Sequence, residues 1–411
     1  MTHIVVVGAG PAGIAAALTA KESGARVTLL DDNPAVGGQI WRADLRASHW
    51  LERLRGSGVA ITTSARVVSG DVARQTLVVD RNGKAEETVY TKLILATGAR
   101  ELFLPFPGWT LPNIMGVGGL QALVKSGLPV AGKRILVAGS GPLLLAVAAY
   151  LRKCGAIVVL IAEQTDTANL ASFTAALAAH PSKLWQAARL NPLFAGIRYL
   201  SHCWVVAARG KSRVERARLR RGSRVWEEAC DYVANAYGFV ANTELAVLLG
   251  CALENGSVRV DQSQQTSVSN VYAAGEMIGI GGVDTASLEG QIAGYAAVGQ
   301  PGKAAPLLRA LHKAKSFAAL LNKTFHPRAE LRTLAEPDTI VCRCEDVTLD
   351  RLRQANSWRS AKLHARCGMG PCQGRICGPA VQYILGWEPV SVRTPVFPTR
   401  LENLILENPV K

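Results

Sequence analysis

A glycine pattern near the N-terminus constrains this 411-residue chain more than any other feature. Residues 4–7 are an uninterrupted apolar run, typical of a strand that is buried on both faces. Gly8 and Gly10 allow a tight turn whose backbone approaches a pyrophosphate, and Gly13 allows the following helix to pack against the strand. The pattern therefore predicts a strand, a phosphate-binding turn and a helix.

The residues around this turn agree with that prediction. Pro11 lies where a helix tolerates proline, and the helix start offers unpaired N–H groups and a positive dipole end to an anion. We expect the helix to run to Glu22 and to stop at Gly24. A second strand over 26–30 would then place Asp31 where a ribose hydroxyl needs an acceptor. The prediction is a dinucleotide site; the alternative is a glycine-rich structural turn.

Composition bounds the class of protein. The chain is 49% hydrophobic and 19% charged, as an ordinary globular protein is, and no apolar stretch reads as a membrane span. No signal peptide precedes the first strand, so we expect a cytoplasmic protein. A formal charge of +15 admits an acidic partner or a nucleic acid. However, the densest basic stretch, 209–224, alternates like a β-hairpin and lacks stacking aromatics, so we favour a generally basic surface and no nucleic-acid partner.

A second glycine-containing stretch follows the first unit. Paired glycines at 37–38 would let the backbone approach a bulky ligand, to which Gln39 and Arg42 could bond. A surface turn with a trailing helix is the alternative. Farther on, a buried strand over 93–96 ends in the small-residue turn Thr97-Gly98.

The first unit then recurs imperfectly. A strand at 134–138, the turn Gly139-Ser-Gly141, a helix to about 153 and a strand at 157–161 predict a second dinucleotide-type fold. Leu144 replaces the third glycine. Counting from the first glycine, the position of Asp31 falls on Ala162, and the acid Glu163 comes one residue later. Because a one-residue slip reverses side-chain direction in a strand, Glu163 need not reach a ribose. This fold is either a scaffold, a site for another nucleotide or a working nicotinamide site.

The rest of the chain returns to the first fold and then leaves it. Residues 171–202 look helical with breaks at Pro181 and Pro192, and 231–237 has strand character. A strand near 266–274 leads to Gly275 and Glu276, followed by a helix over about 285–297. The fold class is therefore α/β with two Rossmann-like folds, followed by a Lys/Ala/Leu-rich helical connector over 301–337.

Five of the nine cysteines lie between 342 and 377. Cys342 and Cys344 are separated by 22 residues from Cys367, which is followed by Cys372 and Cys377. Four thiolates on two tight loops suit a [2Fe–2S] cluster, with glycine amides free to bond the sulfurs. We prefer Cys342, Cys344, Cys367 and Cys372 as ligands, with Cys377 able to replace one. Zinc and a metal-free loop are the alternatives, although the paired CxxC knuckles of zinc ribbons are missing.

The glycine motif, the Ala96-Thr97-Gly98 turn and the stretch from Tyr272 to Glu276, arranged around an inserted second fold, resemble the two-dinucleotide-binding-domain flavoproteins related to thioredoxin reductase. The resemblance covers residues 1–300 and implies bound FAD. The FAD-contacting residues that it implies are Gly8, Gly10, Pro11, Gly13, Asp31, Gly38, Gln39, Arg42, Thr97, Gly98, Gly275 and Glu276. The redox CxxC of thioredoxin reductases is absent, so electrons must leave the flavin by another route.

The cysteine strings resemble the bacterioferritin-associated-ferredoxin-like (BFD-like) [2Fe–2S] domain. The implied domains are FAD-binding (1–110 and 231–300), second and degenerate nucleotide-binding (111–230), helical connector (301–337), BFD-like (338–390) and C-terminal tail (391–411). This order resembles the α (A) subunits of heteromeric bacterial amino-acid dehydrogenases, the group of opine oxidases, D-hydroxyproline dehydrogenase and hydrogen cyanide synthase.

That group implies a relay function. A β subunit related to amino-acid oxidases would remove hydride from an amino acid, imino acid or opine, and this chain would pass the electrons on. A small ferredoxin-like γ subunit often accompanies the pair, and the resemblance admits FMN at a subunit interface. An NAD(P)H-dependent reductase that feeds its own cluster through FAD is the alternative, and an assembly protein without redox chemistry is a third. We predict no catalytic residue here, because the seven histidines (His3, His49, His180, His202, His312, His326 and His364) are scattered.

Overall fold

The computed structural model describes residues 2–42, 48–181, 183–185, 196–389 and 392–404. The chain folds as two compact units, each formed by segments that are far apart in the sequence. Unit 1 contains residues 1–100, 240–319 and 391–411, and unit 2 contains residues 101–239 and 320–390. Strands β8 (Ala99–Glu101) and β17 (Phe239–Ala241) and helix α10 (Ala305–Thr324) each contain one of the boundaries.

Unit 1 is built on a five-stranded parallel sheet in the order β20-β7-β1-β2-β3. Its remaining strands form the antiparallel sheet β4-β5-β6 and the hairpin β18-β19. The elements are β1 (His3–Val7), α1 (Pro11–Glu22), β2 (Arg26–Leu30), α2 (Gly38–Trp41), α3 (Ser48–Gly56), β3 (Ala60–Thr62), β4 (Ala65–Asp71), β5 (Thr76–Arg81), β6 (Lys84–Val89), β7 (Lys92–Leu95), α8 (Glu244–Leu248), β18 (Leu253–Glu254), β19 (Ser257–Val258), β20 (Val271–Ala273), α9 (Gly282–Ala297), η4 (Pro301–Ala304) and η6 (Leu401–Leu404).

The first predicted unit is confirmed, with β1 beginning one residue earlier, at His3. Strand β1 pairs in parallel with β2 and β7, and its central residues are fully buried, as an apolar run covered on both faces requires. Helix α1 ends at Glu22, as predicted. A β-carbon built on Gly13 would lie 1.7 Å from the carbonyl oxygen of Gly8, so only glycine allows this helix to sit so close to the strand.

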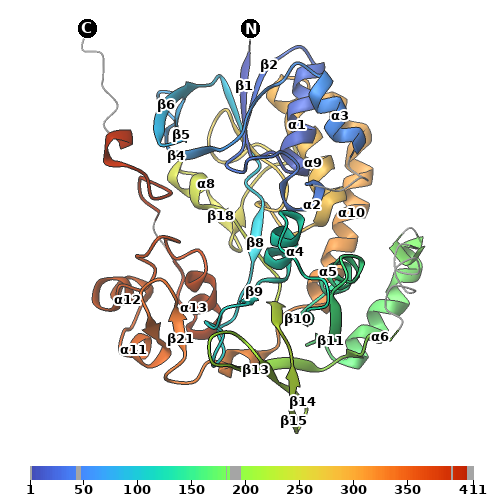
Figure 1. The fold of residues 1–411 in the computed structure, drawn as a ribbon. Coiled ribbons are helices and arrows are strands. Elements are labelled where there is room, and N and C mark those ends of the chain that lie inside the picture. The colour runs from blue at the N-terminus through green and yellow to red at the C-terminus, as the bar shows by residue number, and fades with distance from the viewer. Residues whose placement is uncertain (1, 43–47, 182, 186–195, 390–391, 405–411) are drawn as a thin grey trace. The chain divides into compact units, whose positions relative to one another are not determined.

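Helices α1 and α9 pack side by side against the parallel sheet (Figure 1). Their contact uses backbone surface, because a β-carbon on Gly290 would lie 2.1 Å from the carbonyl oxygen of Ala12. One turn farther on, a β-carbon on Gly294 would lie 2.7 Å from the carbonyl oxygen of Ala16. Small residues on both helices therefore fix the position of α9 relative to the glycine turn.

Unit 2 contains a second five-stranded parallel sheet in the order β12-β11-β10-β16-β9. The elements are β9 (Ile114–Met115), α4 (Val117–Lys125), β10 (Arg134–Gly139), α5 (Pro142–Lys153), β11 (Ile157–Glu163), α6 (Thr167–Ala176), η2 (Leu177–Ala179), β12 (Tyr199–Leu200), β13 (Cys203–Arg209), β14 (Arg216–Arg221), β15 (Arg224–Ala229), β16 (Tyr232–Ala236), η5 (Ala329–Thr333), β21 (Ile340–Cys342), β22 (Val347–Thr348), α11 (Leu349–Arg353), α12 (Trp358–Ala365) and α13 (Cys377–Leu385).

The expectation that Glu163 is out of register with Asp31 is wrong. Between Ile135 and Leu136 the pairing of β10 with β11 shifts by one residue, so that Val159 is an extra residue. A bulge of this kind absorbs the added residue and restores the side-chain direction beyond it. Glu163 therefore pairs with Gly139, and the β1–β2 register, in which Val7 pairs with Leu30, would place Asp31 in the same way beside Gly8 if continued by one residue.

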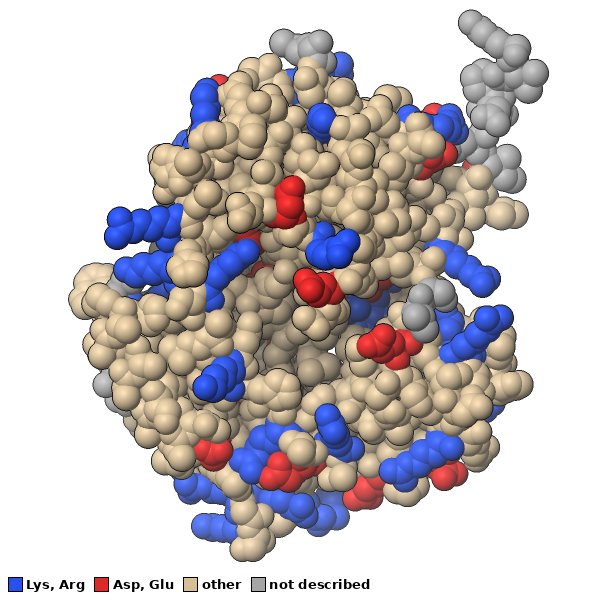
Figure 2. Space-filling model, turned by 180° about the vertical axis from the view of Figure 1, so that it is seen from behind, with Lys and Arg blue, Asp and Glu red and all other residues tan. Residues whose placement is uncertain are grey.

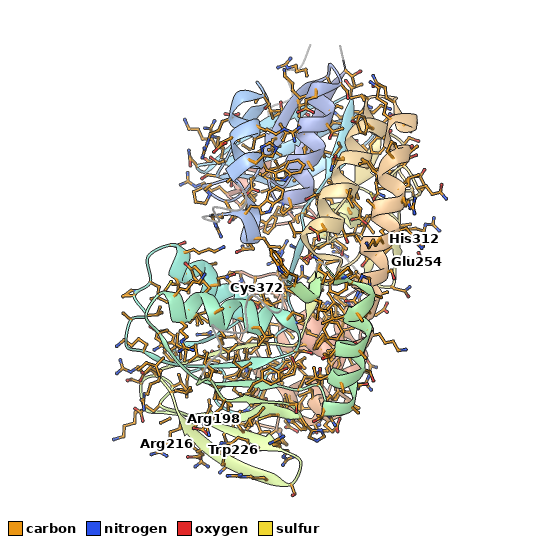
Figure 3. The ribbon with its side chains drawn as sticks, turned by 90° about the vertical axis from the view of Figure 1, so that its right-hand side faces the viewer. Arg198, Arg216, Trp226, Glu254, His312 and Cys372 are labelled. Atoms are coloured by element: carbon orange, nitrogen blue, oxygen red, sulfur yellow. The ribbon has the colours of Figure 1, made fainter. Side chains whose placement is uncertain are left out.

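The basic stretch forms part of the antiparallel sheet β13-β14-β15, as the predicted hairpin requires. Ala217 and Leu219 are buried while the intervening arginines face outward, and Arg216 and Trp226 lie on this sheet in Figure 3. Several of these cations are paired within the sheet, for example Arg209 with Glu227 at 3.2 Å. Basic side chains are dispersed over the face seen in Figure 2, with acidic ones between many of them. This distribution favours the generally basic surface.

The helical stretch predicted over 171–202 is only partly described. Helix α6 and the short η2 account for 167–179, and β12 follows at 199–200. Residues 182 and 186–195 lie outside the described residues. The connector over 301–337 is helical as predicted, through η4, α10 and η5. With its two parallel-sheet folds, the chain has the α/β class that we expected.

The close contact between α1 and α9 yields a test. In Gly290→Val, the added side chain must push α9 away from α1, which we expect to lower the free energy of unfolding by about 1–3 kcal/mol. Gly302→Val is the control, because a β-carbon there meets no atom within 4 Å. Urea denaturation followed by circular dichroism measures both variants. Equal stabilities for the two would contradict the tight contact.

Candidate functional site

The glycine turn of unit 1 is built so that one face stays open. A β-carbon on Gly8 would lie 2.2 Å from the carbonyl oxygen of Ala96, whereas one on Gly10 would meet no atom within 4 Å. Gly8 and Gly13 therefore serve the packing of strand and helix, and Gly10 borders open space. Pro11 is the first residue of α1, whose first turn carries no acidic side chain. The positive end of the helix is thus available to an anion.

Asp31 ties the glycine turn to the loop after β2. Its Oδ2 atom accepts a hydrogen bond from the backbone N–H of Ala9 at 2.5 Å, and Oδ1 accepts two from Asn33 at 2.8 Å. Asn33 in turn accepts from Arg42 Nη1 at 3.3 Å, and Gln39 accepts from Arg42 Nη2 at 3.3 Å. The structure therefore joins Asp31, Gln39 and Arg42 in one polar network, which includes Asn33, a residue the sequence analysis did not single out.

The paired glycines lie against the first glycine turn. The N–H of Gly37 donates to the carbonyl oxygen of Ala9 at 2.8 Å, and a β-carbon on Gly38 would lie 3.0 Å from the Cα atom of Gly10. Gly37 and Gly38 both have positive φ angles, which glycine adopts at little cost. Gly38 is thus brought beside Gly10 and Pro11, although they are far apart in the sequence.

The turn after β7 meets the segment after β17. Thr97 Oγ1 donates to the carbonyl oxygen of Asn242 at 2.6 Å and lies 3.4 Å from the sulfur of Met277. The carbonyl oxygen of Gly98 accepts from the N–H of Asn242 at 2.9 Å. Thr97 is therefore placed next to the residue that follows Glu276.

The half-buried carboxylate of Glu276 and the buried carboxylate of Glu289 lie at the Gly275 turn. Glu276 accepts a hydrogen bond from the N–H of Gly282 at 3.2 Å, at the start of α9. Glu289, which the sequence analysis missed, accepts from the N–H of Gly275 at 3.1 Å and pairs with Lys315 at 3.0 Å. Burial raises the pKa of both carboxyl groups. The sequence signal that could have identified Glu289 is an acidic residue in a helix whose other buried residues are mostly small.

These residues fit a flavin dinucleotide. Among the described residues of unit 1, five buried side-chain polar atoms have no hydrogen-bond partner: Arg42 Nε and Thr285 Oγ1, which belong to the segments of this site, and Tyr90 Oη, Gln264 Oε1 and Gln300 Oε1. Thr285 lies in the first turn of α9, after the Gly275 turn. Buried polar atoms are nearly always satisfied, so Arg42 Nε and Thr285 Oγ1 are candidates for contact with a bound molecule.

The cysteine-rich region of unit 2 forms a second candidate site. The sulfur atoms of Cys342, Cys367 and Cys377 lie within 4.8 Å of one another, and all three residues are buried. Hydrogen bonds from the thiols of Cys367 and Cys377 hold the pKa of Cys342 far below its usual range. Backbone N–H groups of Gly368 and Glu345 also contact this sulfur. The hydrogen bonds with Cys342, together with burial, raise the pKa of Cys367 and Cys377, so the pocket favours a single thiolate at Cys342, the form that binds metals.

The other two cysteines lie at the margin of this group. Cys344 is exposed and Cys372 is half-buried, and the two are hydrogen-bonded through side chain and backbone. A β-carbon on Gly370 would lie 2.3 Å from the Cβ atom of Cys344, so glycine is required where the two loops meet. Of the predicted ligands, the structure thus places Cys342 and Cys367 in the buried trio, with Cys377 in place of Cys344 and Cys372.

The glycines between the cysteines shape the loop around an aromatic residue. A β-carbon on Gly368 would lie 2.7 Å from the ring of Trp358, and one on Gly374 would lie 3.1 Å from it. Trp358 belongs to a small core of its own with Val347, Leu349 and other residues. Three thiols held by this core, with Cys344 and Cys372 at its margin, suit a bound metal centre, and the donor set fits an iron–sulfur cluster as well as zinc.

Two arginines near the cysteines contact neighbouring side chains. Arg366 donates to Glu345 at 2.7 Å, and Arg343 lies with its guanidinium 5.9 Å from the ring centre of Trp109.

His312 lies on α10 (Figure 3), and most of the other histidines are on separate elements. In the part of the chain that the structure describes, no helix is both long enough and apolar enough to cross a membrane.

The chain is similar to known proteins in both sequence and structure. The model of the pyridine nucleotide-disulphide oxidoreductase family matches residues 2–290. The A subunit of opine oxidase from Rhizobium meliloti is 32% identical, covering 98% of this chain and 86% of its own length. The HcnB subunit of hydrogen cyanide synthase from Pseudomonas aeruginosa is also 32% identical, covering 91% of this chain and 90% of its own length.

A solved structure shares the fold over nearly the whole chain. The L-proline dehydrogenase of P. horikoshii superposes with a TM-score of 0.70 at 19% identity, over 98% of this chain and 79% of that one. The sequence relatives are named as subunits, so they act within larger complexes. The chain therefore belongs to the pyridine nucleotide-disulphide oxidoreductase family of flavin-dependent oxidoreductases, in the group of opine oxidase A subunits and hydrogen cyanide synthase HcnB subunits.

Proposed function

We propose that the chain is the FAD- and [2Fe–2S]-containing electron-transfer subunit of a heteromeric bacterial dehydrogenase. A partner subunit's flavin would oxidise an amino acid, imino acid or opine, and this chain would relay the electrons. One observation carries the proposal: a flavin-type glycine cradle and a buried multi-thiol pocket belong to the same polypeptide. The names of its relatives, HcnB and the A subunit of opine oxidase, supply the substrate class and the complex.

Bound FAD would supply the two-electron chemistry in unit 1. The N–H groups around Gly10 and the start of α1 would hold its pyrophosphate, and Asp31 would face its ribose. Gly38, Gln39 and Arg42 would line the flavin side, together with Thr97 and Gly98. Gly275 and Glu276 would hold the ribitol chain, with Glu289 fixing the Gly275 turn. We assign no catalytic acid or base, because the C–H bond would be broken in the partner.

The [2Fe–2S] cluster would occupy the cysteine pocket. Cys342 and Cys367 belong to both candidate ligand sets: the one chosen by spacing, with Cys344 and Cys372, and the buried trio with Cys377. A cluster carries one-electron steps, which suits a relay between a flavin and an outside acceptor. The same pocket could accept zinc, which would supply no redox chemistry.

The domain division follows from these roles. Residues 1–100 and 240–300 would form the FAD domain and residues 101–239 the second nucleotide fold; these bounds differ by about ten residues from those expected from the sequence, because β16 (Tyr232–Ala236) pairs with β10. The connector would be 301–337, the BFD-like domain 338–390 and the tail 391–411. The proposed partner is a β subunit resembling amino-acid oxidases, with an interfacial FMN and a small γ subunit as further components. We propose that the complex works in the cytoplasm.

A second candidate is an NAD(P)H-dependent reductase that feeds its own cluster through FAD. The observation in its favour is the alignment of Glu163 with Gly139. Glu163 accepts hydrogen bonds from the N–H groups of Gly141 and Thr165 at 2.7 and 2.9 Å. Asp31 makes a similar pair of contacts in the first fold, with the N–H groups of Ala9 in the glycine turn and of Asn33 two residues farther on, so the second acid has a geometry close to that of a nucleotide site.

Replacing Gly10 tests the flavin site without disturbing the fold. Gly10 has an extended conformation with φ near −80°, and a β-carbon there meets no protein atom within 4 Å. We expect Gly10→Val to fold with the wild-type melting temperature of the apoprotein and to lose FAD absorbance almost completely. Gly302→Val is the matched control and should retain FAD. Normal FAD content in Gly10→Val would mean that the site is misplaced.

Cysteine variants test the cluster and its ligands. We expect Cys342→Ser and Cys367→Ser to abolish bound iron and acid-labile sulfide while FAD remains bound, because the cofactors occupy separate units. Cys154→Ser, a cysteine outside the pocket, should keep both cofactors. Comparing Cys344→Ser with Cys377→Ser identifies the remaining ligands by the loss of the cluster absorption and electron paramagnetic resonance spectra. Zinc in place of iron in anaerobically purified protein would end the proposal.

Rapid mixing separates the two candidate functions. If the chain is a relay subunit, the anaerobic protein should show no flavin bleaching on mixing with NADH or NADPH, although dithionite should bleach it. Prompt bleaching by either nucleotide would instead establish the reductase. The dithionite reaction is the control, because it shows that the flavin in that preparation can be reduced.

A further inference from the structure

The two glycine loops of this chain differ in what covers them. Around Gly10 of the first loop, a β-carbon would meet no atom within 4 Å. Around Gly141, the corresponding glycine of the second loop, a β-carbon would touch the ring of Phe325 at 3.6 Å. Phe325 follows α10 directly, and its ring also meets that of Phe173, with ring centres 5.1 Å apart. An aromatic side chain of the same unit thus covers the second loop.

Hydrogen bonds fix this segment in place. Ser140, between the two glycines of the second loop, donates from its hydroxyl to the carbonyl oxygen of Phe325 at 2.8 Å. The amide of Gln164 donates to the carbonyl oxygen of His326 at 3.0 Å and to Ser140 Oγ at 2.9 Å. Its Oε1 atom accepts from the N–H of Arg328 at 3.1 Å. Gln164 is fully buried, so these bonds satisfy both ends of an amide that would otherwise be costly to bury.

Arg328 extends the contact to neighbouring strands. Its guanidinium lies 2.9 Å from His202 Nδ1 and 3.4 Å from the carbonyl oxygen of Gln164, and 5.2 Å from the ring centre of Trp204. Its carbonyl oxygen accepts a hydrogen bond from the hydroxyl of Tyr383. Tyr383 lies on α13, the helix that begins at Cys377. Residues 325–328 therefore connect the second glycine loop to the cysteine region.

A dinucleotide would need the space that this segment takes. Its pyrophosphate binds at the glycine loop, against the N-terminus of the following helix. In the second fold that place faces the ring of Phe325 and the carbonyl oxygens of Phe325 and His326, which repel a phosphate. The acid is in position, but the polar groups of the loop already have partners within the chain.

We propose that residues 325–328 take the place of a bound dinucleotide at the second glycine loop. This fold therefore excludes NAD(P)H, and it anchors the cysteine module instead. The inference concerns the protein scaffold and does not depend on which metal the cysteines hold. It also gives a reason for keeping a nucleotide fold whose acid and first two glycines are intact.

Equilibrium dialysis of the wild-type protein tests the exclusion. We expect no saturable binding of NADH or NADPH up to about 1 mM, the upper end of ordinary KM values. Saturable binding that ADP-ribose displaces would overturn the inference, even where the flavin stays oxidised. FAD and iron are measured in the same samples. Their absence would count against the proposed function and not against this inference.

Hydrogen exchange tests whether residues 325–328 are held against the second glycine loop. In Gln164→Leu, which keeps the side-chain volume but removes the hydrogen bonds, amides of 325–331 should exchange roughly tenfold faster or more, as the loss of two hydrogen bonds implies. Gln382→Leu, an exposed glutamine of α13, is the control and should match the wild type. Equal exchange rates for residues 325–331 in the wild type and in Gln164→Leu would show that the segment is not held against the second glycine loop.

Discussion

The close approach of backbone to backbone at glycine determines the architecture of unit 1. Gly13 lets α1 reach the carbonyl oxygen of Gly8, and Gly290 lets α9 reach that of Ala12. Because these contacts are made by backbone atoms, no side chain can move aside to relieve a clash. The positions of the two helices are therefore fixed within a narrow range. The open face at Gly10 exists because its neighbours are packed in this way. The cradle is thus a consequence of the packing, and the candidate flavin site inherits its rigidity.

Much of this arrangement could be predicted from the sequence because the signals are local. An apolar run, three glycines and a proline define β1, the turn and α1, and the helix ends at Glu22 as its Gly24 stop predicts. The place of Glu163 could not be predicted by counting. The extra residue that realigns it is a bulge at Val159, in a strand whose apolar residues give no sign of an irregularity. Register depends on pairing between strands, which a residue count does not contain.

Contacts between distant segments explain the other differences. Spacing favoured Cys344 and Cys372, because pairs of cysteines on tight loops are the usual ligand pattern. The structure buries Cys377 beside Cys342 and Cys367 because α13 begins at that residue and packs against β21, where Cys342 lies. Glu289 and Thr285 were missed for a similar reason, since a helix period alone does not show which residue lies under the Gly275 turn.

The two nucleotide-type folds show that a sequence motif and a binding site are different things. Both folds keep the strand, the turn and an acid that accepts two backbone hydrogen bonds. What separates them is a segment that begins 185 residues after Ser140 of the second glycine loop, and whose carbonyl oxygens accept hydrogen bonds from Ser140 and Gln164. A buried serine and glutamine next to a glycine loop would be costly without partners, and here the chain itself provides them. We propose that the open loop of one fold and the filled loop of the other give the two units different roles. The first can hold a dinucleotide, and the second supports the region that holds the thiols.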